Sequence, residues 1–177
     1  MAKFEVVSRF AGEEDLLIPQ RKTAGAAGYD LIIAEDVVIP TYQEAIKPIA
    51  GNTWFYRVMT LEDIAGLTKE TGAKPTLASV GVKCKLDPGT YLELSLRSSI
   101  PLKHWLLLAN SVGVIDEDYY NNPDNEGEIF LQLINISPYP IVLRKGDRVG
   151  QGIIKPYLTV EGDETAGIRT GGFGSTN

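Results

Sequence analysis

Alternating apolar and polar residues flank a turn in the stretch Ser79-Val-Gly-Val-Lys-Cys-Lys-Leu-Asp-Pro-Gly-Thr-Tyr-Leu-Glu-Leu-Ser-Leu96. Every second residue from 80 to 86 is apolar, and leucine recurs at 92, 94 and 96 after the turn. This period of two is typical of half-buried strands. Asp87-Pro-Gly89 is a strong turn signal. The stretch therefore predicts one strand over 79–86 and a second over 90–96.

Further short segments of strand type lie on either side of this stretch, with turn residues between them. They are predicted at 4–9, 36–39, 106–109, 128–136, 141–143 and 148–155. Pro40 ends the second of them, Pro138 and Pro140 separate two others, and Lys145-Gly-Asp147 forms a turn. Many short strands with evenly spaced turns predict an all-β barrel or sandwich.

One segment departs from this pattern. Thr60-Leu-Glu-Asp63 resembles a capping box, in which a hydroxyl and a carboxylate three residues later satisfy the first backbone N–H groups of a helix. Apolar residues then recur at helical spacing until Gly72, so a single helix is predicted over 60–71. The aromatic run Trp54-Phe55-Tyr56 either packs this helix on the barrel or forms a partner surface.

Composition limits the class of protein. The 177 residues are 44% hydrophobic and 23% charged, which suits one soluble domain with a sizeable core. The formal charge of −6 argues against a surface for duplex nucleic acid. No apolar run is long enough to span a bilayer, and no apolar signal-peptide region follows Met1. The only cysteine, Cys84, is predicted to be a core residue, and a cytoplasmic location is expected.

Five short segments carry residue types that nucleotide chemistry needs. In chain order they are Ala27-Gly-Tyr-Asp-Leu31, Arg97-Ser-Ser-Ile-Pro101, Asn110-Ser-Val-Gly-Val-Ile-Asp-Glu-Asp-Tyr119, Gly146-Asp-Arg-Val-Gly-Gln151 and Arg169-Thr-Gly-Gly-Phe-Gly-Ser-Thr-Asn177.

Two of these segments offer donors for phosphate. Arg97 with Ser98 and Ser99 forms either a phosphate cradle or the N-cap of a helix. Gln151 adds an amide donor. Arg148 is predicted to pair with one of the acids.

The third segment offers one side chain that suits a nucleobase and one that could activate water. The amide of Asn110 has a donor and an acceptor, which suits the edge of a nucleobase. Asp116 is either a general base on water or part of a solvated acidic turn with Glu117 and Asp118. The single His104 is predicted to be partly buried and structural, with a general-base role as the alternative.

The C-terminal segment combines glycines, a cation and a ring. Glycine backbone can approach a ligand closely, Arg169 fits phosphate, and the ring of Phe173 can stack on a base. A lid for a nucleotide is predicted, with a flexible linker as the alternative.

Taken together and in this order, the five segments closely resemble the motifs of the trimeric dUTP pyrophosphatases (dUTPases). The resemblance spans 27–177, and two spacings agree with the family pattern: 13 positions from Arg97 to Asn110 (110 − 97) and 19 from Arg97 to Asp116 (116 − 97). It implies a jelly-roll-like distorted β-barrel with one short helix, and a homotrimer with active sites shared between subunits. The implied reaction converts dUTP and water to dUMP and pyrophosphate with Mg²⁺, which limits uracil in DNA and supplies dUMP for dTMP synthesis.

The resemblance also implies residue roles. Asp116 resembles the base that activates water for attack at the α-phosphorus, Asp30 the acid that orients water and neighbouring side chains, and Tyr119 the residue under the sugar. The remaining substrate-binding positions are Arg97, Ser98, Ser99, Asn110, Gly113, Val114, Ile115, Phe130, Gln151, Arg169, Phe173, Gly174 and Ser175. No side chain is expected to ligate the metal directly, because the triphosphate and water hold Mg²⁺.

Three departures from the family pattern stand out. Residues 121–126 intervene before Gly127, and are expected to lengthen a hairpin tip without moving Asp116 or Tyr119. Arg169 stands four positions before Phe173 (173 − 169) rather than five. Residues 51–78 exceed what compact members carry. The expected organisation is a barrel domain over 1–166, with this insert, and a C-terminal lid over 167–177.

Two alternatives follow from the same resemblance. A dCTP deaminase would need a titrating glutamate shortly after Gly127, where this chain has Gln132. A binding module would use residues 51–78 to hold a regulatory protein. Neither nucleic acid nor membrane is an expected partner.

Overall fold

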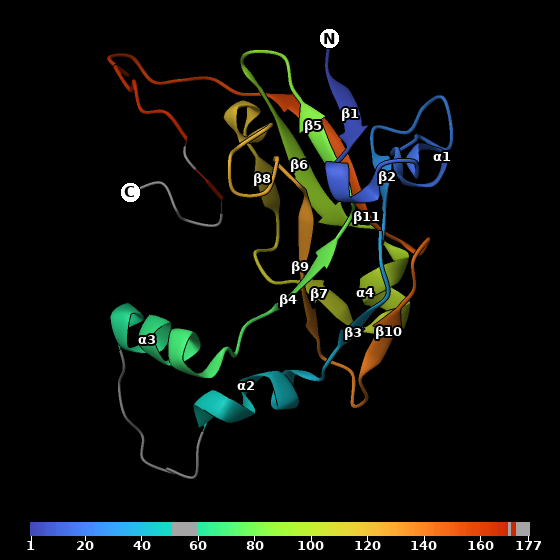
Figure 1. Ribbon diagram of the computed structural model, residues 1–177, viewed down its shortest axis with the longest axis vertical. Helices are drawn as coiled ribbons and strands as arrows, with labels where there is room; N and C mark the ends of the chain where they lie inside the picture. The colour runs from blue at the N-terminus through green and yellow to red at the C-terminus, as the bar shows by residue number, and fades with distance from the viewer. Residues whose placement is uncertain (51–59, 170, 173–177) are drawn as a thin grey trace.

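The computed structural model describes residues 1–50, 60–169 and 171–172. These residues form strands in four sheets, and all strand pairs within the sheets are antiparallel (Figure 1). The strands are β1 (Lys3–Val6), β2 (Tyr29–Ile32), β3 (Val37–Ile39), β4 (Thr76–Ser79), β5 (Val82–Lys85), β6 (Thr90–Leu96), β7 (Leu106–Leu108), β8 (Gly113–Ile115), β9 (Phe130–Asn135), β10 (Ile141–Leu143) and β11 (Arg148–Pro156). The mostly-β prediction is confirmed.

The largest sheet has the order β2-β11-β6-β8, so that β2 and β8 are its two edges. A three-stranded sheet has the order β4-β9-β7, and β1-β5 and β3-β10 form pairs. One core joins them, because apolar side chains from every sheet are buried together, among them Leu31, Leu92, Leu131, Val82 and Ile39. Cys84 belongs to this core and is 1% exposed, as predicted.

The segment predicted as one strand over 79–86 is two strands. β4 ends at Ser79 and pairs with β9, whereas β5 begins at Val82 and pairs with β1. Gly81 has a φ of +67°, and a Cβ there would lie 2.8 Å from side-chain atoms of Ala34 and Leu17. The chain therefore turns from one sheet to the other at this glycine, and residues 78–82 around it are all buried rather than alternately buried and exposed.

The helices are α1 (Glu14–Leu17), α2 (Tyr42–Ala50), α3 (Leu61–Thr71) and α4 (Ser99–His104), with 3₁₀ turns at Ser8–Phe10 and Glu117–Tyr119. The predicted α3 and its capping box are confirmed, since Thr60 Oγ1 accepts from Asp63 N at 3.1 Å and Thr60 N donates to Asp63 Oδ2 at 2.9 Å. The prediction of one helix was wrong, because α1 and α2 were not foreseen and α4 was foreseen only as the N-cap alternative at Ser98 and Ser99.

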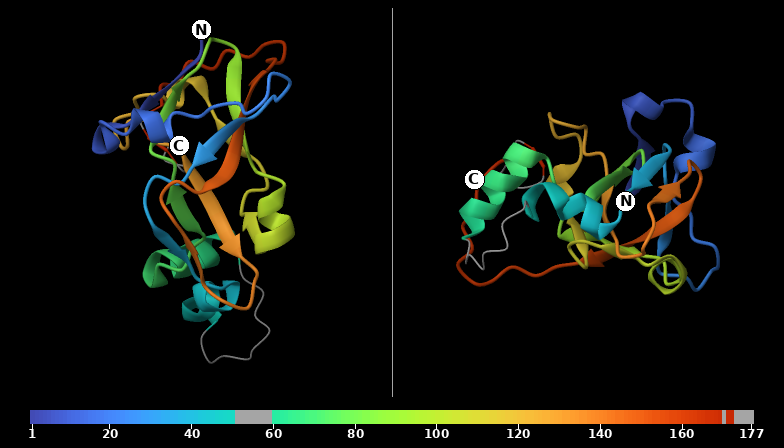
Figure 2. Two further views of the ribbon diagram at one scale, coloured as in Figure 1. Left: turned by 90° about the vertical axis from the view of Figure 1, so that its right-hand side faces the viewer. Right: turned by 90° about the horizontal axis from the view of Figure 1, so that it is seen from below.

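Helices α2 and α3 lie together at the end of the molecule away from the N-terminus, while the C-terminal segment leaves β11 and passes on the side of β8 (Figures 1 and 2). Trp54-Phe55-Tyr56 lies outside the described residues. No helix among the residues described is long and apolar enough to cross a membrane.

Candidate active site

A cavity of about 200 Å³ lies beside β8 and gathers residues from two of the five segments, together with residues of β6 and β9. It is lined by Leu94, Asn110, Gly113, Val114, Ile115, Asp116, Tyr119, Phe130, Gln132 and Arg169. Eight of these were predicted substrate-binding or catalytic residues, so the structure brings together side chains that are up to 59 positions apart (169 − 110).

Strand β8 presents backbone to this cavity. It is an edge strand that pairs only with β6, so its other edge has N–H and C=O groups free of a strand partner in the described part of the chain. Close packing requires Gly113, since a Cβ there would lie 3.0 Å from Leu94. The tight turn before the strand, with Ser111 at φ +61°, brings Asn110 to its start.

The three acids after β8 have different environments. Asp116 precedes the 3₁₀ turn and does not cap it with its side chain, which is 50% exposed. Glu117 accepts a hydrogen bond from Gly89 N at 2.9 Å, and so ties this turn to the loop before β6. Asp118 pairs with Arg169. The acidic turn is therefore organised by specific partners rather than simply solvated.

Tyr119 is 6% exposed and lines the cavity. Its hydroxyl donates to Glu128 O at 3.0 Å and accepts from Asn125 Nδ2 at 2.8 Å. Burial raises the pKa of the Tyr119 phenol, so it stays protonated at neutral pH. Residues 121–126 thus contact Tyr119 directly through Asn125. The expectation that they only lengthen a hairpin tip did not include this contact.

Two described residues of the C-terminal segment, Arg169 and Gly172, lie at the cavity of their own chain. Arg169 Nη2 donates to Asp116 Oδ2, and its Nε donates to Asp118 Oδ1 at 2.7 Å. The guanidinium lies 5.9 Å from the centre of the Tyr119 ring. At Gly172 a Cβ would lie 2.8 Å from this ring, so a glycine is needed for the contact. Phe173, Gly174 and Ser175 lie outside the described residues.

A second group of predicted residues surrounds Asp30 on β2. Arg97 Nε lies 3.2 Å from Asp30 Oδ1, and Arg148 Nη1 lies 3.6 Å from Oδ2, which confirms the predicted pairing of Arg148 with an acid. Gln151 is paired with Asp30 in the sheet. A Cβ at Gly28 would lie 2.8 Å from Gln151 Oε1, which explains the small residue two positions before the acid.

The two serines after Arg97 begin α4. Ser98 is its N-cap residue, but its side chain makes no capping hydrogen bond. The N-cap alternative is therefore right about the position of Ser98, although its hydroxyl does not cap the helix. His104, at the other end of α4, is exposed, and the prediction that it is partly buried was wrong.

The residues around Asp30 do not line the cavity beside β8. Asp30 lies on β2 and Gly113 on β8, at opposite edges of the same sheet. Within a single chain, the groups that suit a base are therefore apart from the phosphate donors Arg97 and Gln151, whereas Arg169 lies beside them.

Comparison with known proteins identifies the family. Residues 66–177 match the family model described as dUTPase. The chain belongs to the dUTPase family. It is 38% identical over 175 residues to the deoxyuridine 5'-triphosphate nucleotidohydrolase of Lactococcus lactis, covering 98% of this chain and 95% of that protein. The crystal structure of dUTPase from Streptococcus mutans has a TM-score of 0.69 at 38% identity, covering 90% of this chain and 99% of that one. The dUTPase of Staphylococcus bacteriophage 80alpha has a TM-score of 0.61 at 16% identity, over 96% of this chain and 98% of that one, and so shares the fold.

Four residues that line this cavity or bind its lining residues were not predicted. Leu94 and Gln132 line the cavity, Asp118 binds Arg169, and Asn125 binds Tyr119. The alternation of β9 was a usable signal for Gln132, because it lies two residues after Phe130 and so on the same face. No local signal pointed to Asp118 or Asn125.

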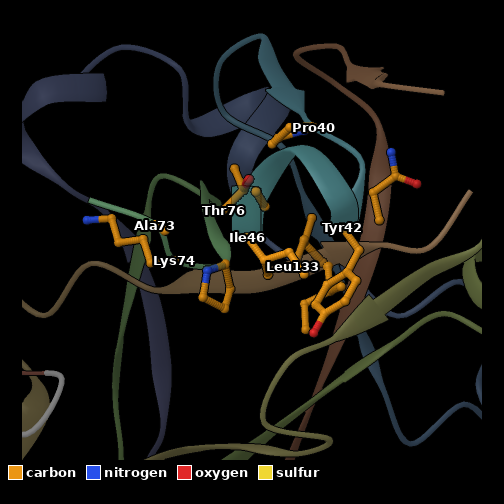
Figure 3. A pocket seen from close by; sticks show the side chains of 11 residues that line it. Pro40, Tyr42, Ile46, Ala73, Lys74, Thr76 and Leu133 are labelled. Carbon is orange, nitrogen blue, oxygen red and sulfur yellow. The ribbon is translucent and has the colours of Figure 1, made fainter. Parts of the chain in front are cut away.

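A different hollow of about 190 Å³ lies between α2, β9 and the start of β4 (Figure 3). Tyr42 and Ile46 of α2 lie beside Leu133 of β9 in it. No predicted site residue of the dUTPase lines it, and its apolar walls do not suit a triphosphate.

Proposed function

We propose that this dUTPase hydrolyses dUTP to dUMP and pyrophosphate, which limits uracil incorporation into DNA and supplies dUMP for dTMP synthesis. The observation that carries the proposal is the cavity beside β8, where an amide, an open strand edge, a buried tyrosine and an exposed carboxylate meet. Membership of the family supports the same reaction.

Uracil would bind along β8. The amide of Asn110 and the unpaired backbone groups of 113–115 offer both donors and acceptors to the edge of a pyrimidine. Because Gly113 is packed against Leu94, the backbone would form a close wall of the slot, and we expect this wall to exclude the methyl group of thymine. Phe130 would complete the slot.

Tyr119 would select the deoxyribose. Its hydroxyl is engaged by Glu128 and Asn125, so the ring offers apolar carbon to the sugar. A ribose 2′-hydroxyl against that ring would lose its hydrogen bonds to water without replacement.

Asp116 would act as the general base. Its carboxylate accepts a proton from a water molecule as the water oxygen attacks the α-phosphorus in line with the bond to the leaving oxygen. The bond between the α-phosphorus and the bridging oxygen breaks, and its electron pair leaves with pyrophosphate. The proton on Asp116 then passes to solvent.

Arg97, Ser98, Ser99, Gln151 and Arg169 would bind the phosphates, since guanidinium, hydroxyl and amide groups donate to phosphate oxygens. Mg²⁺ bound to the triphosphate would neutralise part of its charge. Phosphate oxygens and water would supply the ligands of this ion. Asp30 suits a role toward that hydration shell, because its buried Oδ2 accepts no hydrogen bond from the described residues.

Active sites would be shared between the subunits of a homotrimer. The separation of the Asp30 group from the cavity within one chain supports this, because one nucleotide needs both. Residues 1–166 would form the barrel and 167–177 the lid, with Phe173, Gly174 and Ser175 against the nucleotide. Truncation after Gly167 should then leave a folded protein with little hydrolysis, measured by melting temperature and pyrophosphate release.

Residues 51–78 would serve a second function, the binding of a regulatory protein. The observation that favours it is that α3 buries none of its residues, while Leu61 is 91% exposed and Ile64 41%. The test compares the whole protein with a variant lacking 53–75. Loss of a partner with hydrolysis retained supports the binding role, and loss of hydrolysis with no partner to lose makes the segment structural.

One panel tests the reaction itself. Pyrophosphate release is measured from dUTP, dCTP, UTP and dTTP, with and without Mg²⁺, together with ammonia release from dCTP. Selective, Mg²⁺-dependent release from dUTP is the expected result. Ammonia from dCTP would instead identify a deaminase, and nucleotide binding without turnover a binding protein.

A further inference from the structure

The loop formed by residues 121–126, which departs from the family pattern, is closed by its own backbone. Asn121 N donates to Glu126 O, and Glu126 N donates to Asn122 O, each at 3.0 Å. Asn121 and Glu126 both have a φ of +59°. A Cβ at Gly127 would lie 2.5 Å from the carbonyl oxygen of Tyr119, so the end of the loop packs on the backbone of that tyrosine.

Two asparagine side chains of the loop also hold Tyr119. Asn122, which is 5% exposed, donates to the Tyr119 carbonyl at 3.0 Å. Asn125 Nδ2 donates to the Tyr119 hydroxyl at 2.8 Å. Oδ1 of the same Asn125 accepts from Asn122 Nδ2 at 2.7 Å and from Gly127 N at 3.1 Å. Two donors on one side fix the Asn125 amide, so its NH₂ group must face the phenol.

We propose that Asn125 is a positioning residue that sets the sugar selectivity of the enzyme by fixing the ring of Tyr119. The phenol is bound between Asn125 and the Glu128 carbonyl, so the ring cannot retreat from a 2′-hydroxyl without breaking a hydrogen bond. The proposal rests on the function above, in which Tyr119 packs against deoxyribose.

The decisive variant is Asn125→Asp. It keeps an oxygen for Asn122 and Gly127 but replaces the donor toward Tyr119 by an acceptor, so the phenol can no longer donate to Glu128 while it is held by residue 125. The readout is the ratio of kcat/KM for dUTP to that for UTP. We expect this ratio to fall roughly tenfold, as for the loss of one hydrogen bond. An unchanged ratio overturns the proposal.

Two matched controls come from the neighbouring residue. Asp124 is exposed, and its side chain makes no hydrogen bond or ion pair in the part of the chain that the structure describes. Asp124→Asn should leave the ratio unchanged. The exchange Asp124→Asn with Asn125→Asp keeps the charge of the loop and should still lower the ratio. A ratio restored by that exchange would make the effect one of charge and overturn the proposal.

A double-mutant cycle with Tyr119→Phe tests whether Asn125 acts through the hydroxyl of Tyr119. Tyr119→Phe leaves Asn125 in place and should itself lower the ratio, even if Asn125→Asp does not fold. In the Tyr119→Phe background, Asn125→Asp should cause no second fall. A second fall of similar size, or an unchanged ratio in Tyr119→Phe, overturns the proposal.

Failure of the proposed function would be recognised separately. Absence of dUTP hydrolysis by the unsubstituted protein overturns the reaction, and unchanged selectivity in Tyr119→Ala overturns the role of the tyrosine. Relaxed selectivity in Tyr119→Ala with an unchanged ratio in Asn125→Asp overturns only the role of Asn125.

Discussion

Arg169 and Asp116 form an ion pair within one chain, in which Arg169 Nη2 donates to Asp116 Oδ2. Asp118 accepts from Nε of the same guanidinium at 2.7 Å. The Arg169 side chain is 20% exposed although it belongs to the C-terminal segment. The guanidinium therefore contacts one carboxylate oxygen of the proposed general base, and the phosphates of a bound nucleotide would compete with the two carboxylates for it.

Asp116→Asn should lower kcat for dUTP by about 10²–10⁴-fold, because an amide cannot accept the proton of the attacking water. Nucleotide binding should be retained, since the residues proposed to bind the phosphates and the base are unchanged in this variant. The measurement is steady-state hydrolysis combined with binding of a non-hydrolysable dUTP analogue. Asp118→Asn is the control and should retain turnover. A near-normal kcat in Asp116→Asn would show that Asp116 is not the general base.

Arg169→Ala should raise KM for dUTP by roughly 10–100-fold, which is the size expected for a lost charge-assisted hydrogen bond. The KM of Arg169→Lys should lie between those of the unsubstituted protein and Arg169→Ala, because an ammonium keeps the charge but lacks the planar fork of guanidinium. Arg144→Ala is the matched control, since Arg144 is 68% exposed and pairs with Asp36 away from the cavity. An unchanged KM in Arg169→Ala would mean that Arg169 binds Asp116 and Asp118 but does not bind the phosphates.

Coexpression of Asp116→Asn with Arg97→Ala should restore part of the activity that each variant lacks alone. If a site takes Asp116 and Arg97 from different subunits, random assembly leaves about a quarter of the sites with both residues intact. The measurement is specific activity of the mixed oligomer against each parent. No gain on mixing would mean that both residues serve the same site from one chain.

Gly127→Ala should lower the free energy of unfolding by about 2–4 kcal/mol, measured by urea titration. The reason is a φ of +79° combined with a Cβ 2.5 Å from the Tyr119 carbonyl. Gly25→Ala is the control, because a Cβ there has no neighbour within 4 Å in the described structure. Equal effects of the two substitutions would contradict the packing argument.

Because of the Cys84 thiol, the free energy of unfolding should decrease as the pH becomes alkaline. Burial raises its pKa to about 12, so the native state keeps a proton that an unfolded thiol loses above about pH 8.5. This contribution is complete below that pH and is lost as pH rises toward 12. Urea titrations at about pH 7.5 and pH 10 should show a smaller difference for Cys84→Ala than for the unsubstituted protein. The same pH dependence in both would exclude the thiol as its source.

Local patterns predicted those elements whose cause is local. Strand β6 has the predicted bounds because alternation and the Asp87-Pro-Gly89 turn agree. Helix α3 follows from its capping box. Helix α2 also has one, since Thr41 N donates to Glu44 Oε2 and Glu44 N to Thr41 Oγ1, but Pro48 inside the helix hides the signal.

Contacts between distant residues explain the remaining differences. The break at Gly81 depends on Ala34 and Leu17, which no pattern around residue 81 reveals. The residues of the cavity were found because their chemical types recur in the family motifs. The pairing of Asp118 with Arg169 spans 51 positions and required the folded chain.

Strand β11 lies between β2 and β6, and this placement sets the order in which the protein can fold. β2 ends at Ile32 and β6 at Leu96, yet both remain without their shared partner until residues 148–156 are available. Pairing between such distant segments has a high entropy cost of loop closure, so slow folding over milliseconds to seconds is expected. During synthesis the edges of β2 and β6 are exposed, and they are the segments at which newly made chains would aggregate.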